Sequence, residues 1–157
     1  MIIEPKFEMV QDFSNERSIV DLYGQKGVIN KRGEWVIEPR YPGIIQLFPN
    51  IFRSERYLYD LDGNEIELPF LVDYYGDVSE GLLPFLDYNS EKWGFINDRG
   101  EVVIEPQFDE VNESVSFSEG LCAVRIKKKW GYINRYGRMV IKNSLMKLVI
   151  LAMAWLK

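Results

Sequence analysis

Short apolar runs with the two-residue alternation of β-strands recur along the chain, separated by turn-forming residues. Within residues 123–133, a strand-like segment is followed by the basic turn Lys127-Lys128-Lys129 and by a second alternating segment that begins at Trp130. β-Branched and aromatic residues are abundant in such runs, as is typical of strands. Because no stretch before residue 144 has a helical period, we predict that the body of the protein is all-β.

Similar segments recur at a nearly constant spacing. Residues 93–108 are repeated in part at 130–141, a step of 37 residues, and an earlier copy covers 27–41. A degenerate copy occupies 57–66. One glycine marks the same turn in each copy: Gly33, Gly63, Gly100 and Gly137. Residues 2–7 match 103–108 and the pattern stops after residue 141, so we assign residues 1–143 to a repeat domain with a partial repeat at each end.

Each repeat is predicted to form a three-stranded antiparallel meander with a short fourth extended piece, which lies near 108–111 in the third repeat. The hairpin turn carries Asn-x-x-Gly, in which the Asn side chain caps the turn and Gly supplies a positive φ. Proline ends the returning strand because it cannot donate to the strand ladder. These prolines are Pro5, Pro39, Pro69 and Pro106. In a second block, Phe-Ser-Glu-Gly-Leu, we interpret Glu80 and Glu119 as turn residues.

The blocks Lys-Trp-Gly-Phe-Ile-Asn-x-x-Gly, Val-Ile-Glu-Pro-x-Phe and Phe-Ser-Glu-Gly-Leu resemble the WG-repeat family of mostly bacterial proteins. The resemblance covers roughly residues 1–141, and it implies a β-repeat scaffold with no catalytic residues to carry over. Lys26 and Arg56 stand where the pattern has Trp, and Leu68-Pro69-Phe70 lacks its Glu. We therefore expect these repeats to pack differently from the others.

A single repeat of this size cannot bury its apolar face alone, so neighbouring repeats must stack. We predict an open, curved, solenoid-like array. The alternative is a closed, propeller-like ring, in which the two partial repeats complete one another.

Residues 144–157 form a hydrophobic C-terminal tail that is separate from the repeats, with a helix as one expected conformation. Its apolar stretch, 145–156, is too short to span a bilayer. We interpret the tail as a cap over one end of the array. The alternatives are a contact with a partner or a membrane surface, and the altered end of a shortened gene.

The composition argues against several classes of function. The chain has no histidine, which removes the most common general base and zinc ligand, and its single cysteine cannot form an internal disulfide. A net charge of −5 argues against binding to nucleic acid. Neither a signal peptide nor a transmembrane segment is visible, so we expect a cytoplasmic protein. No cofactor is expected.

Several carboxylates are candidate residues for a catalytic or calcium site. Glu4, Glu38 and Glu105 are repeat-equivalent, and equivalent positions do not provide the two different environments that a catalytic acid pair needs. Residues 60–64 carry oxygen donors at alternate positions, as a calcium loop does, but they align with the hairpin turn of the other repeats. We interpret both sets as structural.

The remaining candidates also favour structural roles. Trp93 and Trp130 share one repeat position, which predicts core anchors between stacked repeats rather than an aromatic ligand ladder. Cys122 lies among apolar residues and is interpreted as a small hydrophobic residue. Arg125 and the lysines at 127–129 are interpreted as a solvated hairpin tip, with an anionic contact as the alternative.

We therefore predict a non-catalytic scaffold for protein–protein interaction, with no binding residue assigned. The alternative is a carbohydrate or cell-envelope binding module, which would use tyrosines outside the repeat positions: Tyr74, Tyr75 and Tyr88. An enzyme would require acidic residues clustered in a deep pocket: Asp73, Asp77 and Asp87.

Overall fold

The computed structural model describes residues 2–112 and 117–142 of the protein. The described residues form strands and no helix. The strands are β1 (Met9–Val10), β2 (Arg17–Leu22), β3 (Gln25–Asn30), β4 (Trp35–Tyr41), β5 (Ile45–Phe48), β6 (Ile51–Ser54), β7 (Tyr57–Tyr59), β8 (Val72–Tyr75), β9 (Leu82–Asp87), β10 (Lys92–Asn97), β11 (Val102–Phe108), β12 (Glu110–Val111), β13 (Cys122–Ile126), β14 (Lys129–Ile133) and β15 (Met139–Ile141). The predicted tail, 144–157, lies outside the described residues.

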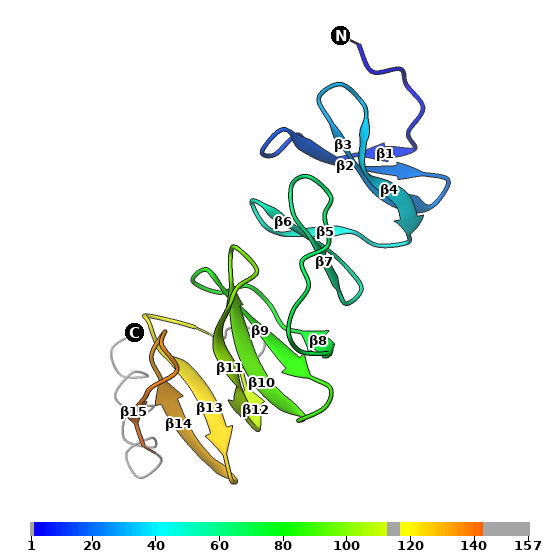
Figure 1. Cartoon of the computed structure of the whole chain (residues 1–157). Helices are drawn as coiled ribbons and strands as arrows, with labels where there is room; N and C mark the ends of the chain where they lie inside the picture. Colours follow the sequence, from blue (N-terminus) through cyan, green and yellow to red (C-terminus); the bar gives the residue numbers. More distant parts are fainter. Residues whose placement is uncertain (1, 113–116, 143–157) are drawn as a thin grey trace. The chain divides into compact units, whose positions relative to one another are not determined.

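The strands form four antiparallel sheets that follow one another along the sequence (Figure 1). The first sheet contains β1 to β4, the second β5 to β7, the third β8 to β11 and the fourth β12 to β15. Hydrogen-bonded neighbours are consecutive in every sheet, and no sheet closes into a barrel. This confirms the predicted all-β fold of tandem antiparallel meanders.

The predicted short fourth piece near residues 108–111 is strand β12. It pairs with β13, with Glu110 opposite Arg125 and Val111 opposite Val124. The piece therefore opens the fourth sheet instead of completing the third. A short strand precedes the meander in the first sheet as well, where β1 pairs with β2.

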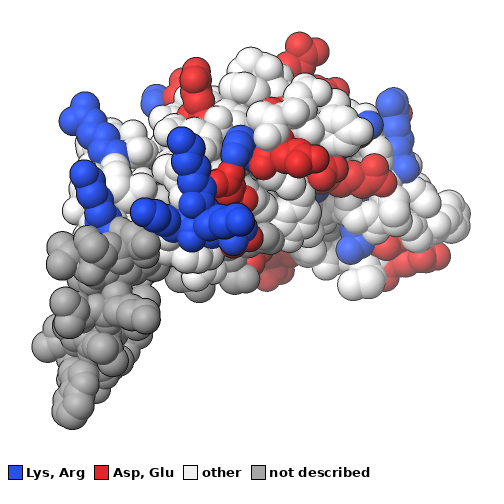
Figure 2. Space-filling view, turned by 90° about the horizontal axis from the view of Figure 1, so that it is seen from below, with Lys and Arg blue, Asp and Glu red and all other residues white. Residues whose placement is uncertain are grey.

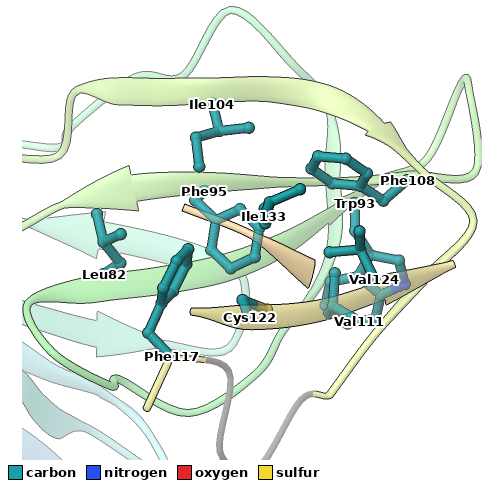
Figure 3. Packing of buried hydrophobic residues seen from close by; sticks show 10 residues of the cluster. All are labelled: Leu82, Trp93, Phe95, Ile104, Phe108, Val111, Phe117, Cys122, Val124 and Ile133. Carbon is teal, nitrogen blue, oxygen red and sulfur yellow. The ribbon is translucent and has the colours of Figure 1, made fainter. Parts of the chain in front are cut away.

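The sheets fall into two compact halves. The N-terminal half contains the first and second sheets together with turn residues 98–100, and the C-terminal half contains the third and fourth sheets. Each half has its own apolar core. The N-terminal core is built from Ile19, Val28, Ile37, Ile44 and Phe52. The C-terminal core is larger, and its side chains point toward one another from the third and fourth sheets (Figure 3).

The Asn-x-x-Gly turns have the predicted geometry. The Oδ1 atom of Asn30 accepts the backbone N–H groups of Arg32 at 2.9 Å and Glu34 at 3.1 Å, and Gly33 has a φ of +76°. A positive φ of this size favours glycine because it lacks a Cβ atom. The turns that begin at Asp60, Asn97 and Asn134 also place a side-chain oxygen on turn N–H groups.

The Ser-Glu-Gly blocks form two-residue hairpin turns. Ser79 and Leu82 exchange both backbone hydrogen bonds, and the residues between them have φ values of 48° at Glu80 and 76° at Gly81. Two successive positive φ values define a type I′ turn, whose twist matches that of the flanking strands. The same arrangement recurs at 118–121. The prediction that Glu80 and Glu119 are turn residues is confirmed.

The Trp-Gly pair faces a bulge in the next strand. Between the pairs Trp93↔Phe108 and Phe95↔Ile104, β10 advances by two residues while β11 advances by four. The extra residues include the Glu-Pro of the motif, and the bulge brings β11 onto Gly94. A Cβ atom at this position would lie 2.7 Å from the carbonyl oxygen of Ile104. The Trp-Gly and Glu-Pro-x-Phe motifs therefore lie on two paired strands and together form one β-bulge. The prediction that proline ends the returning strand is wrong for Pro39 and Pro106, because β4 and β11 each continue for two residues beyond the proline.

The same close approach occurs in the first and fourth sheets. A Cβ atom at Gly27 would lie 2.7 Å from the carbonyl oxygen of Ile37, and one at Gly131 would lie 2.8 Å from that of Ile141. The first repeat was expected to pack differently because it carries Lys26 in place of Trp, but it forms the same bulge. The backbone approach depends on the glycine and not on the preceding side chain. The second repeat does differ, because its sheet has only three strands.

Candidate binding groove

A groove of about 410 Å³ opens on the first sheet, within the N-terminal half. Its lining combines an N-terminal segment with residues of β1, β2, β3 and the β1–β2 connection: Ile3, Glu4, Pro5, Phe7, Val10, Gln11, Asp12, Phe13, Ser18, Val20 and Ile29. The lining is mainly apolar. Such a concave apolar surface is a candidate site for a ligand or a partner.

Strand alternation explains which side chains reach the groove. Successive residues of a strand point to opposite faces, so Ser18 and Val20 line the groove, while Ile19 between them belongs to the core of the N-terminal half. Val10 pairs with Val20 across β1 and β2 and extends the apolar lining outward. The groove thus lies on the face of the first sheet opposite that core.

The repeat makes this face directly comparable with one face of the fourth sheet. The pair Val10↔Val20 in the first sheet corresponds to the pair Val111↔Val124 in the fourth. Val111 and Val124 belong to the C-terminal core, where they pack against the third sheet. Val10 and Val20 in the groove therefore correspond to residues that are buried between two sheets in the C-terminal half.

Exposure differs sharply between the equivalent positions. Val111 is 7% exposed and Phe117 is 1% exposed, whereas Val10 is 65% exposed and Phe13 is 45% exposed. In the C-terminal core, the groups of the third sheet that cover the fourth include Leu82 of β9 and Trp93 and Phe95 of β10, beside Ile104 and Phe108 of β11 (Figure 3). Among the described residues, no counterpart of Leu82, Trp93 or Phe95 fills the groove.

The charged residues that line the groove are acidic. The carboxylates of Glu4 and Asp12 contribute to its lining, and Glu8 is exposed in the segment between them. The Lys6 amine lies over the rings of Phe7 and Trp35, at 5.4 and 6.0 Å from their centroids. The surface therefore offers apolar contacts edged by negative charge.

The two tryptophans at the repeat position have different surroundings. Trp93 is 5% exposed inside the C-terminal core, which confirms its predicted role as a core anchor. Trp130 is only half-buried. The predicted core role of Trp130 therefore stays a prediction.

The repeat-equivalent carboxylates do not converge on one site. Glu4, Glu38 and Glu105 are all exposed, and Glu38 forms an ion pair with Arg40 at 2.7 Å. The arginine pKa is raised by its hydrogen bond with Glu38 and the attraction of that carboxylate. Glu80 accepts the backbone N–H of Gly120 at 3.0 Å, which links two turns of the C-terminal half.

The Asp60 loop is a hairpin turn, as predicted. One carboxylate oxygen of Asp60 accepts the backbone N–H groups of Asp62 and Asn64, each at 2.9 Å. The other accepts the Asn64 side-chain amide at 3.0 Å. Both carboxylate oxygens of Asp60 therefore accept hydrogen bonds within the turn. In residues 2–112 and 117–142, no three His, Cys, Asp or Glu side chains are grouped closely enough to hold a metal ion.

The three aspartates that an enzyme would require differ in burial. Asp73 and Asp77 are exposed, whereas Asp87 is buried at the β9–β10 turn. Burial works to raise the pKa of Asp87, but hydrogen bonds from the Ser90 hydroxyl and backbone, and from the Asn89 backbone, outweigh it and lower the pKa. None of the three acids lines the groove.

The tyrosines considered for a carbohydrate site do not form one platform. Tyr75 is 3% exposed, whereas Tyr74 and Tyr88 are mostly exposed. The Tyr74 ring packs edge-on against Trp93, with centroids 6.0 Å apart.

Cys122 is fully buried in the C-terminal core, as predicted for a small hydrophobic residue. Burial raises the pKa of its thiol to about 12. Of the basic cluster, Arg125 forms an ion pair with Glu110, and Lys127 and Lys128 occupy an exposed turn with positive φ values. The hairpin-tip interpretation is confirmed for these lysines.

Sequence reasoning missed the groove residues Val10 and Phe13. Their signal lies in the repeat itself, because the equivalent Val111 and Phe117 are core residues. The sequence shows that the two pairs are equivalent, but only the structure shows that Val10 and Phe13 are exposed.

The family model of the WG containing repeat matches residues 1–24, 27–46 and 93–130, slightly more than half of the chain. No curated protein matches the sequence significantly. In the part of the chain that the structure describes, no helix is long and apolar enough to cross a membrane.

Proposed function

This chain belongs to the family of proteins with the WG containing repeat, and we propose that it is a non-catalytic β-repeat scaffold that binds another protein through the groove of the first sheet. The supporting observation is the exposure of Val10 and Phe13, whose repeat equivalents are buried. Exposed apolar side chains that converge on a groove are typical of protein-binding surfaces.

The geometry suits a polypeptide better than a small polar ligand. The groove combines buried apolar residues, Val20 and Ile29, with exposed apolar residues at Val10 and Phe13. A partner that supplies apolar side chains would remove this surface from water, and each fully buried large apolar side chain contributes about 1.5–3 kcal/mol. Glu4 and Asp12 would favour partners that carry positive charge around the apolar contact.

Carbohydrate binding, the alternative, has less support. A sugar platform needs several exposed aromatic faces, but Tyr75 is buried and Tyr74 packs against Trp93. Tyr74 and Tyr88 are the exposed members of the set, at 51% and 61%. A glycan array probed with the full chain tests this alternative, and binding that is lost in Tyr88→Ala would favour it over the protein scaffold.

Site-specific photo-crosslinking tests the proposed function. A photoreactive phenylalanine analogue at position 13 of the full chain, expressed in its native cells, is expected to give a crosslinked protein adduct. The control places the same analogue at Tyr23, which is 83% exposed and does not line the groove. Equal labelling at both positions, or none at position 13, would contradict the proposal.

A further inference from the structure

We propose that the third sheet carries a second binding surface, and that this surface binds an arginine-containing segment of another protein. Leu71, Tyr74 and Tyr88 form this tyrosine surface, and they are 48%, 51% and 61% exposed. The tyrosine surface belongs to the C-terminal half, whereas the groove belongs to the N-terminal half. The inference therefore goes beyond the proposed function and does not depend on the groove.

Strand pairing brings the three side chains to one face of the sheet. β8 is an edge strand that pairs with β9 (Figure 1). Tyr74 lies opposite Leu86, and the backbone N–H of Tyr88 donates to the carbonyl oxygen of Leu71 at 2.7 Å. Directly opposite residues share a face of a sheet, as do residues two apart along a strand. Leu86, which packs against the C-terminal core, therefore lies between the two tyrosines.

A bulge in β8 adds a carboxylate to the same face. Between its pairings with Asp87 and Leu86 of β9, β8 advances by two residues while β9 advances by one. Such a bulge changes the alternation of side chains along the strand. Asp73 and Tyr74 are consequently both exposed, whereas the residues on either side of them are buried. The tyrosine thus has a carboxylate directly beside it.

The β9–β10 turn fixes the position of Tyr88. The turn has four residues, 88–91, whereas the β2–β3 and β13–β14 turns have two. One carboxylate oxygen of Asp87 accepts the backbone N–H of Ser90 at 2.9 Å and its hydroxyl at 2.6 Å. The backbone N–H of Glu91 donates to the carbonyl oxygen of Asp87 at 2.9 Å. Because the turn is already ordered, binding to it costs less conformational entropy.

The repeat does not require apolar residues at this surface. Leu86 lies opposite the tryptophan position of its repeat, and the residue there is Arg125 in the fourth sheet and Asp21 in the first. Arg125 forms an ion pair with Glu110, the counterpart of Tyr74. The fold therefore accepts charged side chains where the third sheet has apolar ones. A sheet precedes the third sheet and another follows it, yet the tyrosine surface is exposed, which indicates a contact with another molecule.

The charges around the tyrosine surface favour a cationic partner. Residues 68–91 carry five acidic side chains and no lysine or arginine. Asp73 and Glu91 are exposed, and neither forms an ion pair with a described residue. The next residue along the chain, Lys92, is paired with Asp109. Arginine fits this surface best, because its guanidinium stacks on tyrosine rings and donates to carboxylates at the same time.

The two sheets of the C-terminal half differ in charge. Residues 117–142 carry seven basic and one acidic side chain, in contrast to the acidic segment 68–91. In Figure 2, lysines and arginines gather on the side of the picture where Figure 1 places β13 to β15, and a band of aspartates and glutamates lies next to them. A cationic segment is therefore attracted to the third sheet in preference to the fourth.

Fluorescence anisotropy with the full chain tests the proposal. The probes are synthetic peptides in which leucine alternates with arginine, with lysine or with glutamate. The arginine peptide is expected to bind, the lysine peptide to bind about threefold more weakly, and the glutamate peptide not to bind. Absence of binding by the arginine peptide, or equal binding by the glutamate peptide, would overturn the proposal.

A tyrosine variant locates the contact. Tyr88→Ser is expected to weaken binding of the arginine peptide by about tenfold, because an aromatic anchor is lost. The matched control is Tyr23→Ser, which removes a tyrosine that is 83% exposed in the β2–β3 turn. Thermal unfolding of both variants is expected to remain close to that of the wild type. Equal affinities of the two variants for the peptide would overturn the proposal.

Neutral variants test the carboxylates. Asp73→Asn and Glu91→Gln are each expected to weaken binding of the arginine peptide by about threefold. Glu105→Gln is the control, because it removes an exposed charge from β11, at the opposite edge of the same sheet. The same weakening in Glu105→Gln would mean that the peptide responds only to the net charge of the protein, and it would overturn the assigned site.

The two proposals can fail separately. Val10→Asp in the groove is expected to leave the affinity for the arginine peptide unchanged, and loss of binding in this variant would overturn the tyrosine surface as the site. Absence of crosslinking at position 13, with peptide binding that still depends on Tyr88, overturns the proposed function alone. Glycan binding that is lost in Tyr88→Ala, without peptide binding, would assign the tyrosine surface to carbohydrate and overturn the present inference.

Discussion

Gly94 lies so close to Ile104 that a Cβ atom on the glycine would stand 2.7 Å from the isoleucine carbonyl oxygen. A contact this short with backbone cannot be relieved by a change of rotamer. The bulge that brings the two strands together contains the Glu-Pro of the motif and recurs in the first sheet. The close approach of the two strands therefore requires glycine at this position of the repeat.

Substitution of this glycine should destabilise the fold. Gly94→Ala is expected to lower the free energy of unfolding by about 2 kcal/mol or more, because β11 must move away from β10. Gly43→Ala is the matched control, since a Cβ atom at Gly43 would meet nothing within 4 Å. Urea unfolding of both variants measures the difference. Equal stability in the two variants would contradict the role given to the close approach.

Two equivalent phenylalanines should differ in their effect on stability. Phe117→Ala removes a ring that is 1% exposed and is expected to cost about 3–5 kcal/mol. Phe13→Ala changes a ring that is 45% exposed, and a cost of about 1 kcal/mol or less is expected. Thermal unfolding of the two single variants provides the comparison. A larger loss in Phe13→Ala would mean that the groove residue already belongs to a core.

The Asp60 turn should make stability depend on pH. Burial works to raise the pKa of Asp60, but hydrogen bonds from Asn64, Asp62 and Gly63 outweigh it, and the pKa lies below its ordinary value. A lowered pKa in the folded state gives stability that is present above the unfolded pKa of about 3.9 and is lost as pH falls through the folded pKa. Wild-type protein should therefore lose this contribution in acid.

Asp60→Asn isolates that contribution. It keeps a turn-capping oxygen, as Asn30 does in the first repeat, but cannot ionise. The difference in unfolding free energy between wild type and variant is expected to shrink as pH falls from about 5 to about 2. Urea unfolding at a series of pH values measures it, and a difference that grows in acid would have the wrong sign.

Cys122 should be unreactive in the folded protein. Burial raises the pKa of the thiol to about 12, so very little thiolate is present at pH 8. Labelling with a chromogenic disulfide reagent is expected to be at least about a hundredfold slower in buffer than in denaturant. Rapid labelling without denaturant, at the rate of the unfolded chain, would contradict the buried position of the thiol.

The sequence by itself predicted the local features of this protein well. The hairpin turn at Asn30 depends on a side-chain oxygen and a glycine a few residues apart, and both are visible in the sequence. The glycine of the Trp-Gly pair recurs in the sequence, and the structure shows that at Gly94 it allows the close approach of a neighbouring strand. Turn and bulge chemistry acts over a few neighbouring residues, so a repeated motif predicts a repeated geometry.

Only the tertiary structure decided which equivalent residues are buried. Trp93 and Trp130 occupy the same position in nearly identical segments, yet the first is a core residue and the second is half-buried. Phe117 and Phe13 differ in the same way. Burial depends on whether another sheet packs against that face, and this contact is made by residues far away in the sequence. The candidate groove could therefore be recognised only in the structure, where equivalent repeat positions are buried in one sheet and exposed in another.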